Sequence, residues 1–73
     1  MNKDSNGWYL AEDGVWTAEK RDLEFMAEVC DRAPVDPWGN TIRWSKGTNN
    51  GNGWETLLHN EDDPSEPIRL RVI

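Results

Sequence analysis

Tryptophan supplies most of the apolar area that this chain can bury, and this constrains its fold more than any other feature. The 73 residues include five Trp, one Tyr and one Phe, whereas the whole apolar fraction is only 36%. One aromatic side chain can bury on the order of 150–250 Å². We therefore expect the core to form around Trp16, Trp44 and at least one of Trp8 and Trp54.

The length and the cysteine content indicate a small protein of a reducing compartment. A chain of 73 residues supports one domain, so we predict a single domain over residues 1–73, with residues 1–6 as a disordered tail. Cys30 is the only cysteine, which excludes an intrachain disulfide. The sequence holds neither a membrane-length apolar run nor the apolar region of a signal peptide, and this predicts a soluble, cytoplasmic protein.

The charge balance narrows the class of partner. Fourteen acidic residues against eight basic ones give a net charge of −6, and no basic patch dominates. This disfavours direct binding of nucleic acid and of anionic membranes. A basic protein surface remains an electrostatically allowed partner, and the alternative is that the acidity only keeps a small protein soluble.

One segment, TAEKRDLEFMAEVCDRAP, has the pattern of an amphipathic helix. Thr17 is a suitable N-cap, and Pro34 ends the segment. At 100° per residue, one apolar stripe contains Leu23, Met26, Ala27, Cys30 and Ala33, and it is widened by Phe25 and Val29. We expect this stripe to cover a sheet and Cys30 to be buried in the core.

The strand signals lie on both sides of this helix. A hairpin is predicted over residues 7–18, because Asp13-Gly14 is a strong turn signal between two short strand-forming runs. Further strands are predicted over 41–44, 54–59 and 68–73, with a polar loop over 45–53. The expected fold is α+β, with one helix on an antiparallel sheet of four to five short strands in the order β-β-α-β-β-β.

The pairing of these strands follows from their side chains. Trp44 and Trp54 would lie at the ends of two paired strands, where the two rings can pack across the pair and close the long 45–53 connection. The 68–73 strand alternates apolar and basic residues and would add to the 54–59 strand.

No grouping of residues predicts catalysis or metal binding. His59 is the only histidine, and with Cys30 it has no recognisable metal-ligand spacing. No nucleophile and orienting group accompany His59 in the sequence. We therefore predict that the protein is not an enzyme and has no cofactor and no metal.

Three polar or exposed segments are the candidates for contact with a protein partner. Trp38 lies in the turn DPWGN and is the tryptophan most suited to exposure, since exposed Trp is enriched at interfaces. The 45–53 loop is long and polar, and residues 61–67 form the densest acidic run. The predicted partner-binding residues are Trp38, Asn49, Asn50, Asn52, Glu61, Asp62, Asp63 and Glu66.

The acidic run admits two interpretations. With Glu12 and Asp13, its carboxylates would imitate a row of phosphates and capture a basic groove. The alternative interpretation is a solvated loop without a binding role.

In size, acidity and lack of catalytic groupings, the chain resembles small accessory proteins of bacteriophages and mobile elements, including inhibitors of bacterial defence systems. The resemblance implies a binding protein that occupies a surface of a protein partner, such as a host defence protein or a nucleic-acid-binding protein. Two alternatives remain open. One is a carbohydrate-binding module that uses exposed Trp. The other is a structural subunit of a larger assembly such as a virion, which self-associates through an unpaired strand edge such as residues 68–73.

Overall fold

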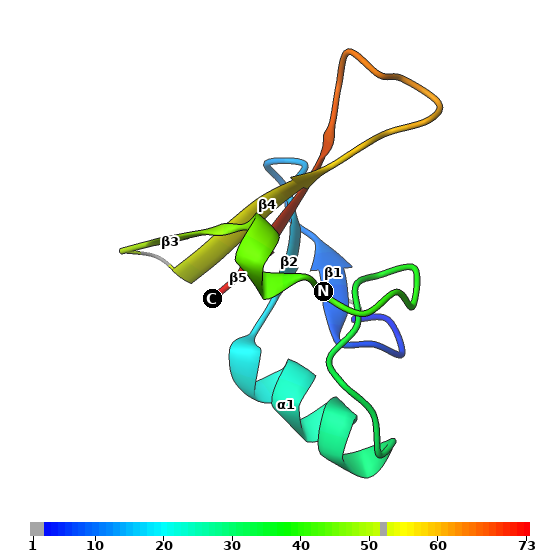
Figure 1. Cartoon of the computed structure of the whole chain (residues 1–73), viewed down its shortest axis with the longest axis vertical. Helices are drawn as coiled ribbons and strands as arrows, with labels where there is room; N and C mark the ends of the chain where they lie inside the picture. Colours follow the sequence, from blue (N-terminus) through cyan, green and yellow to red (C-terminus); the bar gives the residue numbers. More distant parts are fainter. Residues whose placement is uncertain (1–2, 52) are drawn as a thin grey trace.

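The fold is a five-stranded sheet with one helix packed against it. The computed structural model describes residues 3–51 and 53–73. The elements are β1 (Trp8–Leu10), β2 (Trp16–Ala18), α1 (Lys20–Val29), the 3-10 turn η1 (Trp44–Lys46), β3 (Thr48–Asn50), β4 (Gly53–Leu58) and β5 (Ile68–Val72). The strands lie in the order β1-β2-β5-β4-β3 (Figure 1). The predicted α+β class and the β-β-α-β-β-β order are confirmed.

The sheet is mixed, so the prediction of a wholly antiparallel sheet is wrong at one pair. β2 and β5 run parallel, with Trp16 opposite Leu70, whereas the other three pairs are antiparallel. A long connection that includes α1 separates β2 from the later strands, and such a connection permits parallel entry. β5 is paired on both sides, so it does not provide the unpaired edge that was expected at residues 68–73.

The third strand lies later in the chain than predicted. Residues 41–44 contain only an isolated bridge between Val35 and Thr41 and the start of η1. The third strand is instead β3, which lies inside the predicted 45–53 loop. It forms a hairpin with β4 in which Asn50 pairs with Gly53. The expected contact between Trp44 and Trp54 is present, with ring centroids 4.9 Å apart, but Trp44 reaches it from a 3-10 turn and not from a strand.

The core is centred on two tryptophans. Its buried members are Trp8, Ala18, Leu23, Ile42, Trp54, Leu70 and Val72. Trp8 is completely buried and Trp16 half-buried, but Trp44 is 41% exposed, so its predicted place in the core is wrong. Trp44 lies outside Trp54 and covers it, which leaves part of its own ring in solvent.

The connection over residues 30–47 contains no long regular element, and two indole groups hold it against the sheet. The Nε1–H of Trp8 donates to the carbonyl of Val35 at 2.8 Å. The Nε1–H of Trp54 donates to the carbonyl of Trp44 at 3.0 Å. Each buried tryptophan therefore satisfies its own polar atom and fixes one part of the connection.

The helix begins later than predicted. Glu19 occupies the N-cap position, and Thr17 lies in β2, where its hydroxyl donates to the carbonyl of Val15 at 3.0 Å. The helix ends at Val29, and Asp31 has a left-handed φ of 51°.

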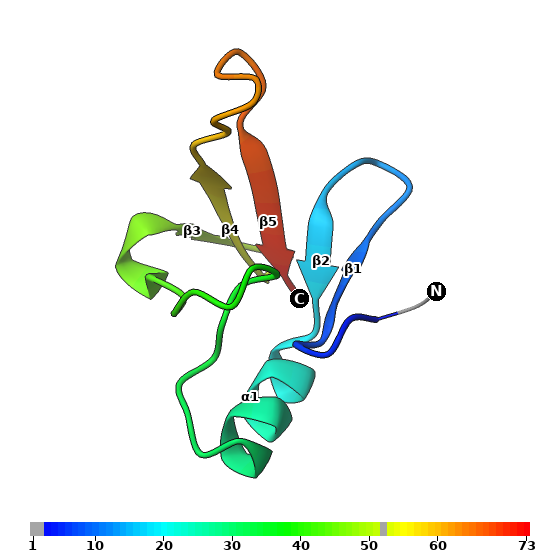
Figure 2. The same cartoon turned by 90° about the vertical axis from the view of Figure 1, so that its right-hand side faces the viewer.

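Only part of the apolar stripe on α1 is covered. Leu23 is its one buried residue, whereas Phe25 and Val29 are more than 60% exposed. In Figure 2, α1 runs away from the end of the sheet, so only its first turns approach the strands. Cys30 follows the last turn and is exposed, so its predicted burial is wrong.

Candidate protein-binding surface

The structure describes no arrangement suited to a metal, and no helix in residues 3–51 and 53–73 is long and apolar enough to span a membrane. Within those residues, no three His, Cys, Asp or Glu side chains lie close enough to hold an ion. His59 is exposed just after β4, and Cys30 is exposed just after α1.

The predicted contact residues are divided between the two ends of the sheet. β4 extends from Gly53 to Leu58, which corresponds to a length of roughly 20 Å. Asn49 and Asn50 lie beside its first residues and are exposed. The acidic run lies beyond its other end, and Asn52 lies outside the described residues. The structure therefore does not bring the asparagines and the carboxylates into one site.

The loop between β4 and β5 is held in one shape by its own hydrogen bonds. We call residues 60–66 the acidic loop. Asn60 is its centre, because its Oδ1 accepts from the backbone N–H groups of Asp62 and Asp63, and its Nδ2 donates to the carbonyl of Glu66 at 3.1 Å. The Oδ1 of Asp63 accepts from the hydroxyl of Ser65 at 2.6 Å. Side chains from the loop itself therefore order its backbone.

The carboxylates of the acidic loop are not neutralised by ion pairs within the described part of the chain. Glu61, Asp62, Asp63 and Glu66 are all exposed, and none forms an ion pair with a described Lys, Arg or His. Figure 1 shows this segment, in orange, as a projection from the body of the protein. Four carboxylates are thus displayed on an ordered projection.

A second acidic turn lies at the same end of the sheet. Because β2 and β5 are parallel, the turn before β2 and the acidic loop before β5 lie at the same end (Figure 2). Asp13 in this turn pairs with Arg71, with 2.9 Å between Oδ2 and Nη1. The hydrogen bond from Arg71 lowers the pKa of Asp13 below its ordinary value of 3.8. Asp13 is therefore neutralised within the chain, whereas Glu12 is exposed and has no ion pair to a described residue.

Trp38 is fixed in an exposed position by its turn. The Oδ1 of Asp36 accepts from the backbone N–H groups of Trp38 and Asn40, both at 2.9 Å, and Gly39 has a φ of +86° that favours glycine. Trp38 is 51% exposed, and its ring meets the ring of Trp16 edge to face, with centroids 5.8 Å apart. The expected exposure of Trp38 is confirmed.

An exposed leucine extends this aromatic pair. Leu10 is the cross-strand partner of Trp16, so both side chains point to the same face of the sheet. Leu10 is 55% exposed and directly precedes the acidic turn. Leu10 was not among the residues predicted from the sequence. Alternation within a three-residue strand indicates which face Leu10 occupies, but it cannot show that Leu10 lies beyond the covered part of the core.

We name this region the acidic–aromatic end. It consists of Leu10, Glu12, Trp16, Trp38 and the acidic loop. It combines an apolar patch with carboxylates that have no cationic partner among the described residues. Comparisons with protein-family models, with curated proteins and with solved structures give no match to this chain.

Proposed function

We propose that this protein is a non-catalytic binding protein whose acidic–aromatic end occupies a basic surface of a protein partner. The observation that carries the proposal is the acidic loop, an ordered projection with four exposed carboxylates and no ion pair to a described residue. Trp38 and Leu10 supply the apolar contact area that a charged surface alone lacks.

Electrostatic attraction determines how fast the proposed complex forms and how its affinity depends on salt. A loop of one charge sign steers an oppositely charged surface and raises the rate of association. Salt screens such interactions over a Debye length of about 8 Å at physiological ionic strength. The affinity of the complex should therefore fall as salt is added.

Basic grooves of nucleic-acid-binding proteins in the cytoplasm are the class of surface that this arrangement suits best. Such grooves bind rows of phosphates, and ordered carboxylates can take the place of phosphates. Occupation of the groove would block the partner, which is how we propose that the protein acts as an inhibitor of a host defence protein or a nucleic-acid-binding protein.

A capture experiment with matched charge variants tests the proposal. The tagged protein is passed through bacterial lysate at low and at high salt, and bound proteins are identified by mass spectrometry. The test variant is Glu61→Gln/Asp62→Asn/Glu66→Gln, whose three side chains make no hydrogen bond within the described chain. The control is Glu24→Gln/Glu28→Gln/Asp31→Asn on and after α1. Each variant loses three carboxylates, which changes the net charge from −6 to −3.

One stoichiometric partner should bind the unchanged protein and the control, be lost at high salt, and fail to bind the test variant. Equal capture by the two variants would show that net charge and not the acidic loop attracts the partner. A salt-independent partner would remove the electrostatic mechanism. If nothing is captured, titration with sugars while Trp fluorescence is followed would test the carbohydrate-binding alternative.

A further inference from the structure

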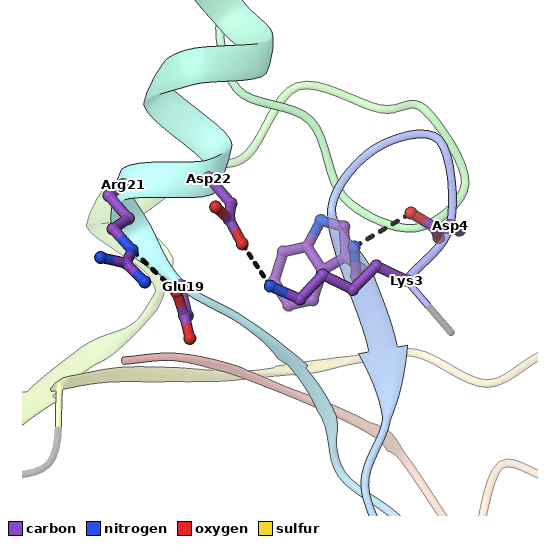
Figure 3. A network of polar contacts seen from close by, with 6 residues as sticks. Lys3, Asp4, Glu19, Arg21 and Asp22 are labelled. Atoms are coloured by element: carbon purple, nitrogen blue, oxygen red, sulfur yellow. Dashed lines mark hydrogen bonds and ion pairs between the residues drawn. The ribbon is translucent and has the colours of Figure 1, made fainter. Parts of the chain in front are cut away.

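The sheet has two edge strands, β1 and β3, and a further stretch of open edge on β4, and these differ in how they are protected. At β1, the N–H of Trp8 donates to the side chain of Asp4 at 3.0 Å, and the carbonyl of Trp8 accepts from the N–H of Asp4 at 2.7 Å. Figure 3 shows Asp4 beside the start of this strand. β3 is a three-residue edge strand of Thr and Asn. The second half of β4 is the third edge, and it combines apolar residues with an unpaired backbone.

β4 extends beyond its partner β3. The last β3–β4 pair is Thr48 with Glu55, whereas Thr56, Leu57 and Leu58 pair with β5 alone. No described strand lies on their other side. Leu57 is 62% exposed at this edge. Alternate backbone N–H and C=O groups of these three residues must therefore point away from β5 into open space.

The chain before β3 does not fill this position. Residues Trp44–Lys46 turn into η1, and the carbonyl of Lys46 accepts a hydrogen bond from the hydroxyl of Thr56 at 3.1 Å. Thr56 shares a face with Leu70 and Trp54, which is the core side of the sheet. The turn is thus bonded to a side chain on that face, and the backbone edge of β4 stays open.

Grooves lie on both faces of this edge. On the core side, a groove of about 860 Å³ has an apolar floor formed by Ile42, Leu58 and Leu70. On the open side, a groove of about 410 Å³ is lined by Leu57 together with Lys46 and Arg69. A strand laid along the edge would place alternate side chains in these two grooves.

The charge at this edge is opposite to that of the whole protein. Lys46 and Arg69 line the open-side groove, are exposed, and form no ion pair with a described residue. Arg43 lies on the core-side groove and is also without such a pair. Asp36 also lines the core-side groove, but it is buried and its Oδ1 already accepts the backbone N–H groups of Trp38 and Asn40. Among the described carboxylates, Glu55 alone lines the open-side groove, and it lies where β4 still pairs with β3. Beyond that pair, the edge therefore favours anionic side chains.

We propose that the Thr56–Leu58 edge of β4 binds an extended acidic peptide segment of a protein partner as an added strand. Main-chain hydrogen bonds to β4 would hold the segment in register. Its apolar side chains would lie over Ile42, Leu58 and Leu70, and its carboxylates beside Lys46 and Arg69. This site is distinct from the acidic–aromatic end and would allow one protein to contact both a basic and an acidic surface.

The charges also argue against a second copy of this chain at the edge. If two β4 edges paired about a two-fold axis, the cations of each copy would approach those of the other. Like charges that face each other across strands destabilise the pair. Self-association through β4 is therefore an outcome that would contradict the proposal.

The probe for this site is an acetylated and amidated peptide of alternating Val and Glu, six residues long, added to the ¹⁵N-labelled protein. We expect chemical-shift changes and slower amide exchange at Thr56–Leu58. A peptide of alternating Val and Lys should not bind. Two further peptides carry N-methyl groups on all Val or on all Glu residues, and only one of these two should bind, because alternate N–H groups of a strand point to opposite sides.

Two charge variants locate the site on the protein. Lys46→Glu/Arg69→Glu should weaken binding of the Val–Glu peptide by roughly tenfold or more. The control Lys20→Glu/Arg21→Glu on α1 has the same change in net charge, from −6 to −10, and should bind as the unchanged protein does. Glu61→Gln/Asp62→Asn/Glu66→Gln should also bind the peptide normally, which separates this site from the acidic loop.

Four results would overturn the proposal. These are no shift at Thr56–Leu58 up to millimolar peptide, equal binding of the two N-methylated peptides, equal binding of the Val–Lys peptide, and dimers formed through β4 in light scattering without peptide.

Discussion

The two sides of the sheet differ in whether the backbone groups at the edge are hydrogen-bonded. At β1, the turn formed by residues 4–7 folds back so that Asp4 bonds both backbone groups of Trp8. At the opposite edge, β3 covers only the first half of β4, and Thr56–Leu58 keep an open backbone. A few residues outside a strand therefore decide whether its edge is available. At β1, the residues that bond the edge come just before the strand. At β4, the residues just before β3 form η1 and do not pair with Thr56–Leu58.

Both edges nevertheless use one buried tryptophan in the same way. Trp8 and Trp54 each donate an indole N–H to a carbonyl of the connection over residues 30–47. The carbonyl at the β1 edge belongs to Val35, which is 7% exposed, and the carbonyl at the other edge belongs to Trp44, which is 41% exposed. Water can therefore replace a lost bond more easily at the second edge.

This difference in burial predicts that the bond of Trp8 contributes more to stability than the bond of Trp54. Trp8→Phe should lower the free energy of unfolding by about 1–3 kcal/mol through the unsatisfied carbonyl of Val35, with a further cost for the cavity. Trp54→Phe should cost less, because water can reach the carbonyl of Trp44. Urea denaturation of both variants measures the difference. An equal loss would show that burial of the acceptor does not distinguish the two edges.

A glycine beside Trp54 offers a second test at the open edge. A Cβ on Gly47 would overlap the indole ring of Trp54, whereas a Cβ on Gly51 would meet no atom within 4 Å. Gly47→Ala should therefore destabilise the protein by about 1–3 kcal/mol, as overpacking usually does. Gly51→Ala, in the turn after β3, should have a much smaller effect on the urea midpoint. Similar midpoints for the two variants would mean that Trp54 can move aside without cost.

The closed edge can be opened by one substitution. Asp4→Ala removes the acceptor of the Trp8 and Asn6 N–H groups and should cost about 0.5–1.5 kcal/mol. Hydrogen exchange at the Trp8 amide should become faster. Asp4→Asn keeps an oxygen acceptor and serves as the control. If Asp4→Ala leaves this amide as protected as before, the turn at residues 4–7 does not close the edge.

The smallest expected effect concerns the ion pair between Asp13 and Arg71. The hydrogen bond from Arg71 lowers the pKa of Asp13 in the folded state below 3.8. The pair therefore stabilises the fold above pH 3.8, and this contribution is lost as the pH falls through the lowered pKa. Asp13→Asn should lower the urea midpoint slightly at neutral pH and not at all in strong acid.

Glu12→Gln is the control for this pair, because Glu12 lies in the same turn and has no ion pair to a described residue. Its midpoint should match that of the unchanged protein at both pH values. A difference between Asp13→Asn and the unchanged protein that persists in strong acid would have to come from the turn and not from the ion pair.

Local signals in the sequence predicted the parts of the fold that depend on neighbouring residues. Asp13-Gly14 placed the first hairpin, and Gly14 has the positive φ that such a turn needs. The alternation in IRLRVI placed β5 beside β4, with Leu70 and Val72 buried. Both signals act over a few residues, and neither could show that β5 also pairs in parallel with the distant β2.

The failed predictions depend on distant contacts. Alternation of Ile42 and Trp44 suggested a strand, but Ile42 is buried within an irregular connection whose backbone is bonded to Trp54. The periodicity of α1 predicted an apolar stripe at Cys30, but periodicity cannot show how far a helix extends beyond the sheet. At the candidate site, the exposure of Trp38 followed from its turn. The separation of the asparagines from the acidic loop required the strand order.

The central position of β5 has a consequence for how this protein is made. β5 follows the other four described strands in the chain, yet it joins the β1–β2 hairpin to the β3–β4 hairpin. Until residues 68–72 emerge, the two hairpins have no common partner, and neither is large enough to be stable alone. Trp8 and Trp54 therefore lack the core that they share with Leu70 and Val72 until β5 emerges, and in that interval chaperones or the protein's own partner can bind the nascent chain.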